Sequence, residues 1–136
     1  MTPLFLDSAF LIALEDRSDQ HHKAAHAYWR THTPTLVTTA YVLDEAVTFF
    51  NRRGHHAKAV EIGTYLLASP SVQFIYVDEA LFHIGWEQFQ RDRDKRYSFT
   101  DCISFAVMRQ FDLTTALTFD QHFVQAGFTR KPDPKG

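Results

Sequence analysis

Short apolar runs alternate along this chain with segments long enough to form helices, and this alternation limits the folds that it can adopt. Leu4 to Leu6 is a continuous apolar run that ends at Asp7, and further strand candidates lie at Leu36–Val37, Val72–Val77 and Thr115–Phe119. Continuous runs of this kind are typical of strands buried on both faces. Strands separated by helices form βαβ units with parallel strands. We therefore expect an α/β protein with three layers, α/β/α, around a central, mostly parallel sheet of four to five strands.

The segments between these runs carry apolar residues at helical spacing. We expect helices, in chain order, ending at Leu14 and then over Gln20–His32, Ala40–Arg53, His56–Ala68, Asp78–Asp94 and Ser98–Phe111. The fifth of these helices is indicated by Leu81, Ile84, Trp86 and Phe89. After Phe128 the sequence becomes polar and contains two prolines, so we expect a polar tail from about residue 129.

Length and composition indicate one domain, residues 1–136, because 45% of the residues are hydrophobic and can fill a single core. The one cysteine, Cys102, can form neither an internal disulfide nor a cysteine-based zinc cluster, as is typical of a protein in the reducing cytoplasm. The net charge of −2 gives no overall cationic field, so any contact with nucleic acid must be local. Asp7 interrupts the apolar stretch Leu4–Leu14, which argues against a signal peptide or a membrane span.

Acidic residues follow two of the predicted strands. Asp7 comes directly after the first, and Asp120 comes after the last. Ligands of open α/β sheets bind at the carboxyl ends of the strands, so the two side chains would share one edge if their strands are parallel neighbours. An Asp between a strand and a helix is also a common N-cap, and for either residue taken alone this interpretation fits as well as a functional one.

The predicted helix from Ala40 carries two adjacent acids, Asp44 and Glu45. Glu45 follows Val42 by three residues and precedes Phe49 by four, which places it within an apolar stripe, whereas Asp44 lies outside that stripe. We therefore expect Glu45 to point inward and Asp44 to be solvated. A buried carboxylate must be paired, protonated or bound to a metal. An arginine partner for Glu45 is the structural alternative.

Asp101 follows Ser98 by three residues, which is the spacing of a capping box. It also leads a stripe formed by Phe105 and Met108, so it faces the core side of its helix. Both a capping role and a place in a functional site remain open for it. Thr100 is placed to assist either role.

These four acids, Asp7, Glu45, Asp101 and Asp120, together predict a ring of oxygen ligands. Four carboxylates a few ångströms apart repel one another and have raised pKa values unless a divalent cation neutralises them. Mg²⁺ or Mn²⁺ fits these ligands, and no clustered His or Cys favours zinc. Such a centre can lower the pKa of a bound water and promote its attack on a phosphodiester.

Four segments that contain these acids resemble the acidic motifs of PIN domains, and they occur in that family's order across nearly the whole chain. The segments are Leu4-Phe5-Leu6-Asp7-Ser8, Val42-Leu43-Asp44-Glu45, Ser98-Phe99-Thr100-Asp101-Cys102-Ile103-Ser104-Phe105 and Leu117-Thr118-Phe119-Asp120-Gln121-His122-Phe123. The resemblance implies a small α/β/α fold with a Mg²⁺- or Mn²⁺-dependent ribonuclease site. It assigns metal binding and catalysis to Asp7, Glu45, Asp101 and Asp120, with Thr100 or Ser8 as a polar helper.

As a stand-alone domain of this kind, the chain is similar to toxins of the VapC type. That similarity implies an endoribonuclease that cleaves RNA phosphodiesters in the cytoplasm, forms a homodimer and is inhibited by a cognate antitoxin in a type II toxin–antitoxin pair. Some relatives have an acid or amide just after the fourth motif, where this chain has His122. The number of bound metals therefore stays open.

Two other functions compete with this interpretation. A catalytically silent PIN-like scaffold or RNA-binding protein would share the fold, but four intact acids argue against it. A phosphoacceptor signalling module would need an adjacent acidic pair after the first strand and a Lys after a later one, where this chain has Asp7-Ser8 and Thr118-Phe119-Asp120.

Local basic residues are the candidates for RNA contacts. Arg91, Arg93, Lys95 and Arg96 alternate with two acids just before the Asp101 helix, and most of them fit a solvated face. Some could hold RNA phosphates. Weaker candidates are Arg52, Arg53, Arg130 and Lys131.

Overall fold

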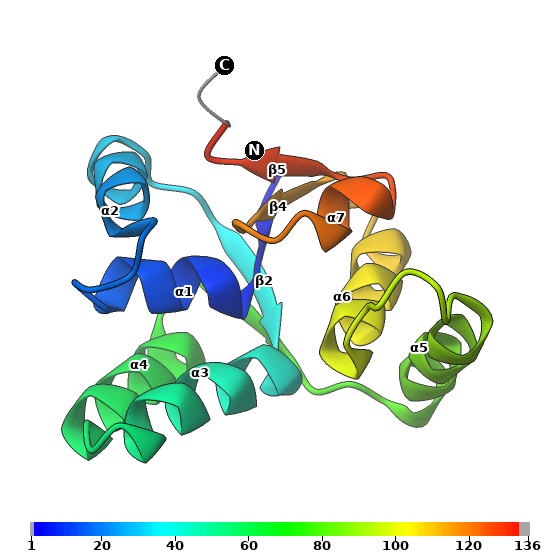
Figure 1. The fold of residues 1–136 in the computed structure, drawn as a ribbon, viewed down its shortest axis with the longest axis horizontal. Helices are drawn as coiled ribbons and strands as arrows, with labels where there is room; N and C mark the ends of the chain where they lie inside the picture. The colour runs from blue at the N-terminus through cyan, green and yellow to red at the C-terminus, as the bar shows by residue number, and fades with distance from the viewer. Residues whose placement is uncertain (1, 134–136) are drawn as a thin grey trace.

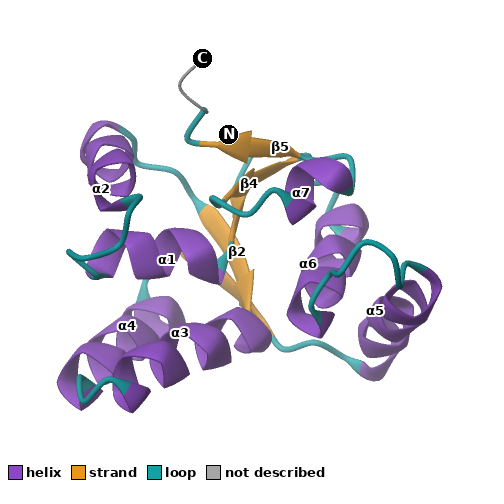
Figure 2. Cartoon of the chain, viewed as in Figure 1, coloured by secondary structure: helices purple, strands orange, loops and turns teal. Residues whose placement is uncertain are grey.

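A five-stranded sheet, parallel throughout, forms the centre of the computed structural model, which describes residues 2–133 (Figures 1 and 2). The strands are β1 (Leu4–Leu6), β2 (Leu36–Thr39), β3 (Val72–Ile75), β4 (Thr115–Leu117) and β5 (Thr129–Lys131). Their order across the sheet is β3-β2-β1-β4-β5, and every adjacent pair is parallel. The prediction of a parallel sheet of four to five strands is confirmed.

Helices cover both faces of this sheet. They are α1 (Ser8–Glu15), α2 (His22–Thr31), α3 (Ala40–Arg52), α4 (His56–Ala68), α5 (Glu79–Arg91), α6 (Phe99–Gln110) and the short α7 (His122–Gln125). In Figure 2, α1 to α4 lie on one side of the strands and α5 to α7 on the other, so the three-layer arrangement is confirmed. Apolar side chains fill both interfaces. Phe10, Phe50 and Leu66 belong to one core, and Phe105 and Phe123 belong to the other.

The pairing of β1 with β4 fixes the position of the site. Leu6 is in register with Leu117, so the chain leaves both strands at the same edge of the sheet. From β1 the chain adds β2 and then β3 on one side, and it then crosses to the other side of β1 to add β4 and β5, so the strand order reverses between β1 and β4. Ligands of open parallel sheets bind at such a switch in strand order.

A fifth strand occupies the start of the region where the sequence predicted a polar tail. Thr129–Lys131 adds to the edge of the sheet, with hydrogen bonds from Thr118 N–H to Lys131 O (2.9 Å) and from Thr129 N–H to Thr114 O (2.8 Å). An edge strand can be held by backbone hydrogen bonds while it buries few side chains. The sequence of this strand is therefore polar and lacks the apolar run that indicates a buried strand. The expected tail is therefore wrong up to Lys131, and residues 134–136 lie outside the described part of the chain.

Helix α5 was expected, but it buries a different face from the one its apolar residues indicated. Of those residues only Leu81 is buried, and the buried face continues through Gly85 and Gln88. Gly85 lets α5 approach α6 closely, since a Cβ atom there would lie 2.7 Å from Ile103 Cδ1. Phe82, Trp86 and Phe89 are exposed on one side of the helix, and we name them the α5 apolar face; Ile84 is exposed on another side.

The longest helices between residues 2 and 133 have 13 residues, and none of them is apolar enough over the necessary length to cross a bilayer.

Candidate metal centre

Asp7 stands at the carboxyl end of β1 with only 3% of its surface exposed. It occupies the N-cap position of α1, but its side chain caps nothing. Instead its Oδ2 accepts a hydrogen bond from Thr118 Oγ1 (2.7 Å). Burial raises the pKa of Asp7 to about 7, and the charges of Asp101, Asp120 and Glu45 add to this increase, although the bond from Thr118 opposes it. The N-cap interpretation of this side chain is wrong.

Thr118 is a site residue that the sequence analysis did not single out. It is fully buried, and its hydroxyl also accepts a hydrogen bond from Asp120 N–H (3.0 Å). The same oxygen therefore connects Asp7 at the end of β1 with the backbone of Asp120 beyond β4. A polar residue directly after an apolar run, two positions before an acid, is the signal that identifies it.

Glu45 lies in the second turn of α3 and points toward α1, as the helical spacing predicted. Its Oε1 accepts a hydrogen bond from Ser8 Oγ (2.7 Å). Burial raises its pKa and the charge of Asp101 adds to the increase, whereas Ser8 and Thr100 lower it. Within residues 2–133 no Lys or Arg lies within 4 Å of this carboxylate, so the structural alternative of an arginine partner is wrong. Asp44 is exposed.

Asp101 both caps its helix and faces the other acids. Ser98 Oγ accepts a hydrogen bond from Asp101 N–H (2.9 Å), and Asp101 Oδ2 accepts one from Ser98 N–H (3.0 Å), which completes a capping box. Burial raises the pKa of Asp101, and Asp120 raises it further, while the bonds from Ser98 and His122 lower it. The two roles that the sequence left open are compatible, since every hydrogen bond found for the carboxylate goes to Oδ2.

His122 belongs to the cluster, which corrects the expectation that no histidine would gather with the acids. Its Nδ1 donates to Asp101 Oδ2 (2.9 Å) and lies 3.5 Å from Asp120 Oδ1. Asp120 Oδ1 accepts a hydrogen bond from His122 N–H (2.9 Å), so the turn after β4 aims the ring at the site. Ligand atoms of these three residues all lie within 4.8 Å of one another. The contact between His122 and Asp101 spans 21 residues, so sequence spacing cannot reveal it.

The structure brings the predicted acids to one edge of the sheet. Asp101 and Asp120 share the cluster with His122, and their charges act on Asp7, as does that of Glu45. Thr100 lies close enough to Glu45 to lower its pKa. Carboxylate oxygens are the ligands that Mg²⁺ and Mn²⁺ prefer, and the pKa values of these acids are raised by burial first and by their mutual repulsion second. The donor set therefore fits a divalent cation held mainly by oxygen.

A parallel α/β/α sandwich with carboxylates gathered at the switch in strand order defines a class of small, metal-binding domains. The chain belongs to the PIN-domain family, whose sequence model matches residues 4–129.

Two kinds of comparison identify its relatives. The chain is 37% identical over 125 residues to the 23S rRNA-specific endonuclease VapC20 of Mycobacterium tuberculosis, in both strain CDC 1551 / Oshkosh and strain H37Rv, covering 92% of this chain and 95% of the relative. The crystal structure of M. tuberculosis VapC20, described as a sarcin-ricin loop cleaving toxin, matches with a TM-score of 0.86 and 36% identity over 93% of this chain and 96% of that chain. A toxin-antitoxin complex from Klebsiella pneumoniae shares the fold (TM-score 0.61, 13% identity, 87% of each chain).

Proposed function

We propose that this protein is an endoribonuclease that depends on Mg²⁺ or Mn²⁺ and cleaves RNA phosphodiesters. The observation that carries the proposal is the convergence of buried carboxylates with raised pKa values at one edge of the sheet. Asp7, Glu45, Asp101 and Asp120 are the proposed metal ligands and catalytic residues, with Thr100 beside them. The whole chain would act as one domain of this kind, in the cytoplasm, where its RNA substrate is found.

A divalent cation held by these four acids would lower the pKa of a water and would stabilise the charge that develops on the phosphate during in-line attack. The chain's own side chains orient the carboxylates. Thr118 fixes Asp7, Ser8 fixes Glu45, and the capping box fixes Asp101. The hydrogen bonds position the acids without neutralising them.

Ribosomal RNA is the proposed substrate class, supported by similarity to the VapC20 endonucleases over most of both chains. The test compares a synthetic stem-loop with the sarcin-ricin sequence against an unrelated hairpin of equal length, each with Mn²⁺ and with EDTA. Cleavage should require the metal and favour the sarcin-ricin stem-loop. Cleavage that continues undiminished in EDTA would contradict the metal proposal, and equal cleavage of both RNAs would contradict the proposed substrate.

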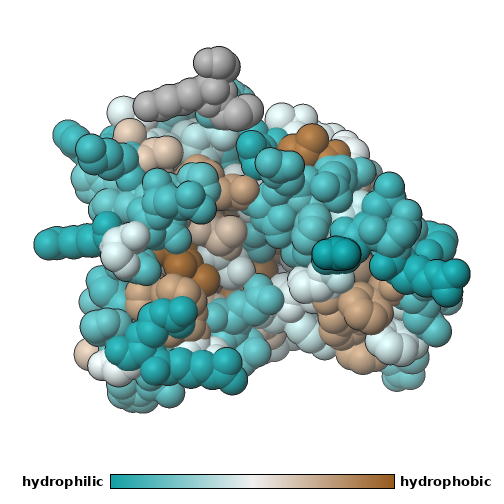
Figure 3. Space-filling model, viewed as in Figure 1, coloured by the Kyte–Doolittle hydropathy of each residue, from teal (hydrophilic) through white to brown (hydrophobic). Residues whose placement is uncertain are grey.

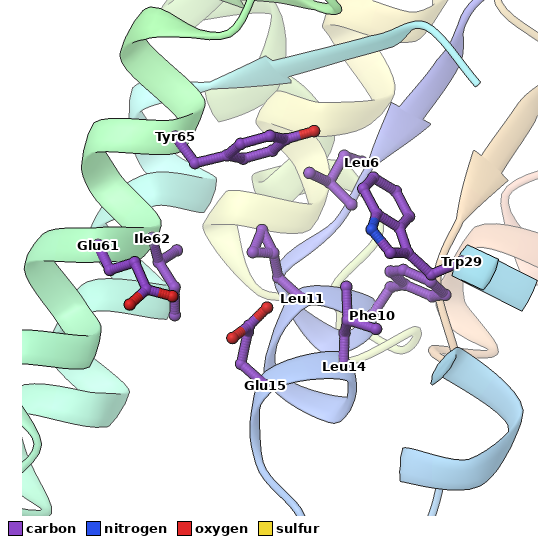
Figure 4. A pocket seen from close by; sticks show the side chains of 9 residues that line it. All are labelled: Leu6, Phe10, Leu11, Leu14, Glu15, Trp29, Glu61, Ile62 and Tyr65. Carbon is purple, nitrogen blue, oxygen red and sulfur yellow. The ribbon is translucent and has the colours of Figure 1, made fainter. Parts of the chain in front are cut away.

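A protein antitoxin is the proposed inhibitor, and an apolar pocket supports a protein partner. The pocket has a volume of about 240 Å³ and lies between β1, α1, α2 and α4 (Figure 4). Its lining is Leu6, Phe10, Leu11, Leu14, Glu15, Trp29, Glu61, Ile62 and Tyr65. Pockets that are mainly apolar take hydrophobic side chains of a partner. Co-expression with a small protein encoded next to this gene should yield a complex without nuclease activity.

A homodimer is the proposed assembly, and the α5 apolar face supports it. Trp86 is 43% exposed and Phe89 is 38% exposed, and Figure 3 shows an apolar area over α5. Contiguous exposed apolar surface marks an interaction site in soluble proteins. Phe99 packs against Phe82 and Trp86 from α6, with ring centroids 5.2 and 6.0 Å apart, so the surface is held in place before any partner binds.

The alternative of a catalytically silent scaffold predicts no cleavage of either RNA under any metal condition. A phosphoacceptor module would instead take up a phosphoryl group on Asp7. The crowding of Asp7 by three other carboxylates disfavours that second function, because an added phosphate would increase the negative charge at the site.

A further inference from the structure

A cleft runs from the acids outward between α1 and α3. Ser8 and Glu45 line one end, and Arg52 and Arg53 line the other, with Thr48 and Phe49 between them on α3; the cleft has a volume of about 600 Å³. In Figure 3 a small apolar area lies over α1 and α3 and is bordered by hydrophilic residues. We name this feature the α1–α3 cleft. It is open to solvent and continuous with the proposed metal centre.

The spacing of residues on α3 aligns the cleft with the site. Phe49 and Arg52 follow Glu45 by four and seven residues, so all three lie on the face of α3 that is turned toward α1. Seven residues of helix advance by roughly 10 Å. A stacked nucleic-acid strand advances by about 3.4 Å per nucleotide. A phosphate at Arg52 would therefore lie about three nucleotides from one at the acids.

The charges of the cleft are separated along its length. Asp44 borders it next to Glu45, so its acids lie near the metal centre and its arginines lie at the far end. Among residues 2–133, neither Arg52 nor Arg53 has a carboxylate within 4 Å. Their positive charge is therefore available to a ligand.

Arg53 is already held in place without being neutralised. Its guanidinium stacks on the Phe49 ring at 3.6 Å from the centroid, and its Nη1 donates to Phe49 O (3.0 Å). The remaining N–H groups can still donate. Arginine binds phosphate oxygens with two parallel hydrogen bonds, and a guanidinium that is fixed beforehand loses less entropy when it does so.

We propose that the α1–α3 cleft binds the RNA backbone beside the bond to be cut, with Arg52 and Arg53 contacting phosphates, a role that rests on the ribonuclease function proposed above. The arginines position the strand and do not take part in the chemical step. They bind backbone phosphates, so their contribution does not depend on the RNA sequence.

The test measures binding separately from cleavage. A fluorescent single-stranded RNA is titrated with the full-length protein in EDTA over a series of salt concentrations, for the wild type, Arg52→Gln and the double variant Arg52→Gln/Arg53→Gln. The double variant should bind at least tenfold more weakly, and its slope of log affinity against log salt should be smaller by about 1.4, since each lost contact to a single strand removes about 0.7. In Mn²⁺, KM should rise and kcat should change by less than about threefold.

Two controls make the result specific. Arg30→Gln removes an exposed arginine on α2, outside the cleft, and Arg93→Gln removes one from the basic segment before α6. Neither should alter the affinity as strongly as Arg52→Gln, which leaves the Arg53–Phe49 stack intact. Melting temperatures check that each variant folds.

Unchanged affinity and salt slope in the double variant would overturn the proposal, as would an equal loss in Arg30→Gln, a larger loss in Arg93→Gln, or no RNA binding by the wild type. A fall in kcat at constant KM would also overturn it. Absence of cleavage by a wild type that binds RNA in EDTA would instead count against the ribonuclease function, so the two failures can be distinguished.

Discussion

Replacing Asp7 with Asn should stabilise the metal-free protein at alkaline pH. Burial and neighbouring acids raise the pKa of Asp7 from 3.8 to about 7. The folded protein therefore keeps a proton that the unfolded chain releases, and the free energy of unfolding falls as the pH rises through this window. At about 1.36 kcal/mol per pH unit, the loss between about pH 5.5 and about pH 7 is about 2 kcal/mol, and no further loss follows above pH 7.

Urea unfolding in EDTA at about pH 5.5 and about pH 8 measures this difference. The wild type should lose about 2 kcal/mol more between the two pH values than Asp7→Asn, because Asn cannot ionise and its Oδ1 can still accept the bond from Thr118. Asp44→Asn is the matched control, since Asp44 is exposed.

Excess Mn²⁺ supplies the second half of the test. A ligand that binds only the folded state stabilises it by about 2.7 kcal/mol at a concentration of one hundred times its Kd. The wild type should gain stability at about pH 8, whereas Asp7→Asn should gain much less. Equal pH dependence in the two proteins would refute the reasoning from burial and charge, and equal stabilisation by Mn²⁺ would refute the role of Asp7 as a ligand.

Four further changes test neighbouring groups. Glu45→Gln should abolish RNA cleavage in a gel assay, whereas Asp44→Asn should retain most of it, and equal losses would contradict the inward orientation of Glu45. Asp101→Ala should lose about 1 kcal/mol of capping energy, and reduced repulsion among the acids should offset this loss in EDTA. Mn²⁺ should raise its melting temperature less than that of the wild type. An identical rise would mean that Asp101 is a helix cap and not a metal ligand. His122→Ala removes a donor that lowers the pKa of Asp101, so the acidic limb of the pH–rate profile should move to higher pH, and an unmoved limb would contradict this. Trp86→Glu should convert a dimer into a monomer in light scattering without reducing secondary structure, and an unchanged mass would exclude the α5 apolar face as the interface.

Most of the fold could be predicted because it depends on local patterns. Continuous apolar runs identified β1 and β4, and the acids that follow them locate one edge of the sheet. The inward direction of Glu45 followed from helical spacing alone, which places it apart from Asp44. These features depend on residues within a few positions of one another, so the sequence is sufficient to recognise them.

Other parts of the site depend on contacts between distant segments. Thr118 bonds to Asp7 across 111 residues, and His122 bonds to Asp101 across 21, so neither contact has a fixed spacing in the sequence. The exposed face of α5 was unpredictable for a similar reason. Gly85, which carries no apolar signal, lets α5 pack closely against Ile103 of α6, and larger apolar residues of the helix are left at the surface.

The hydrogen-bond donors that orient the acids are mostly neutral groups, and this property bears on the function of the site. Hydroxyls of Thr118 and Ser8 orient Asp7 and Glu45, and the backbone N–H of Ser98 orients Asp101. A lysine or arginine in those places would stabilise the fold but would also cancel the charge permanently. Within residues 2–133 no such cation pairs with these acids, and the imidazole of His122 is the one basic group in contact with them. Neutral donors fix the geometry and leave the negative charge for a cation from solution, so the site gives up stability in the metal-free protein in order to bind that cation.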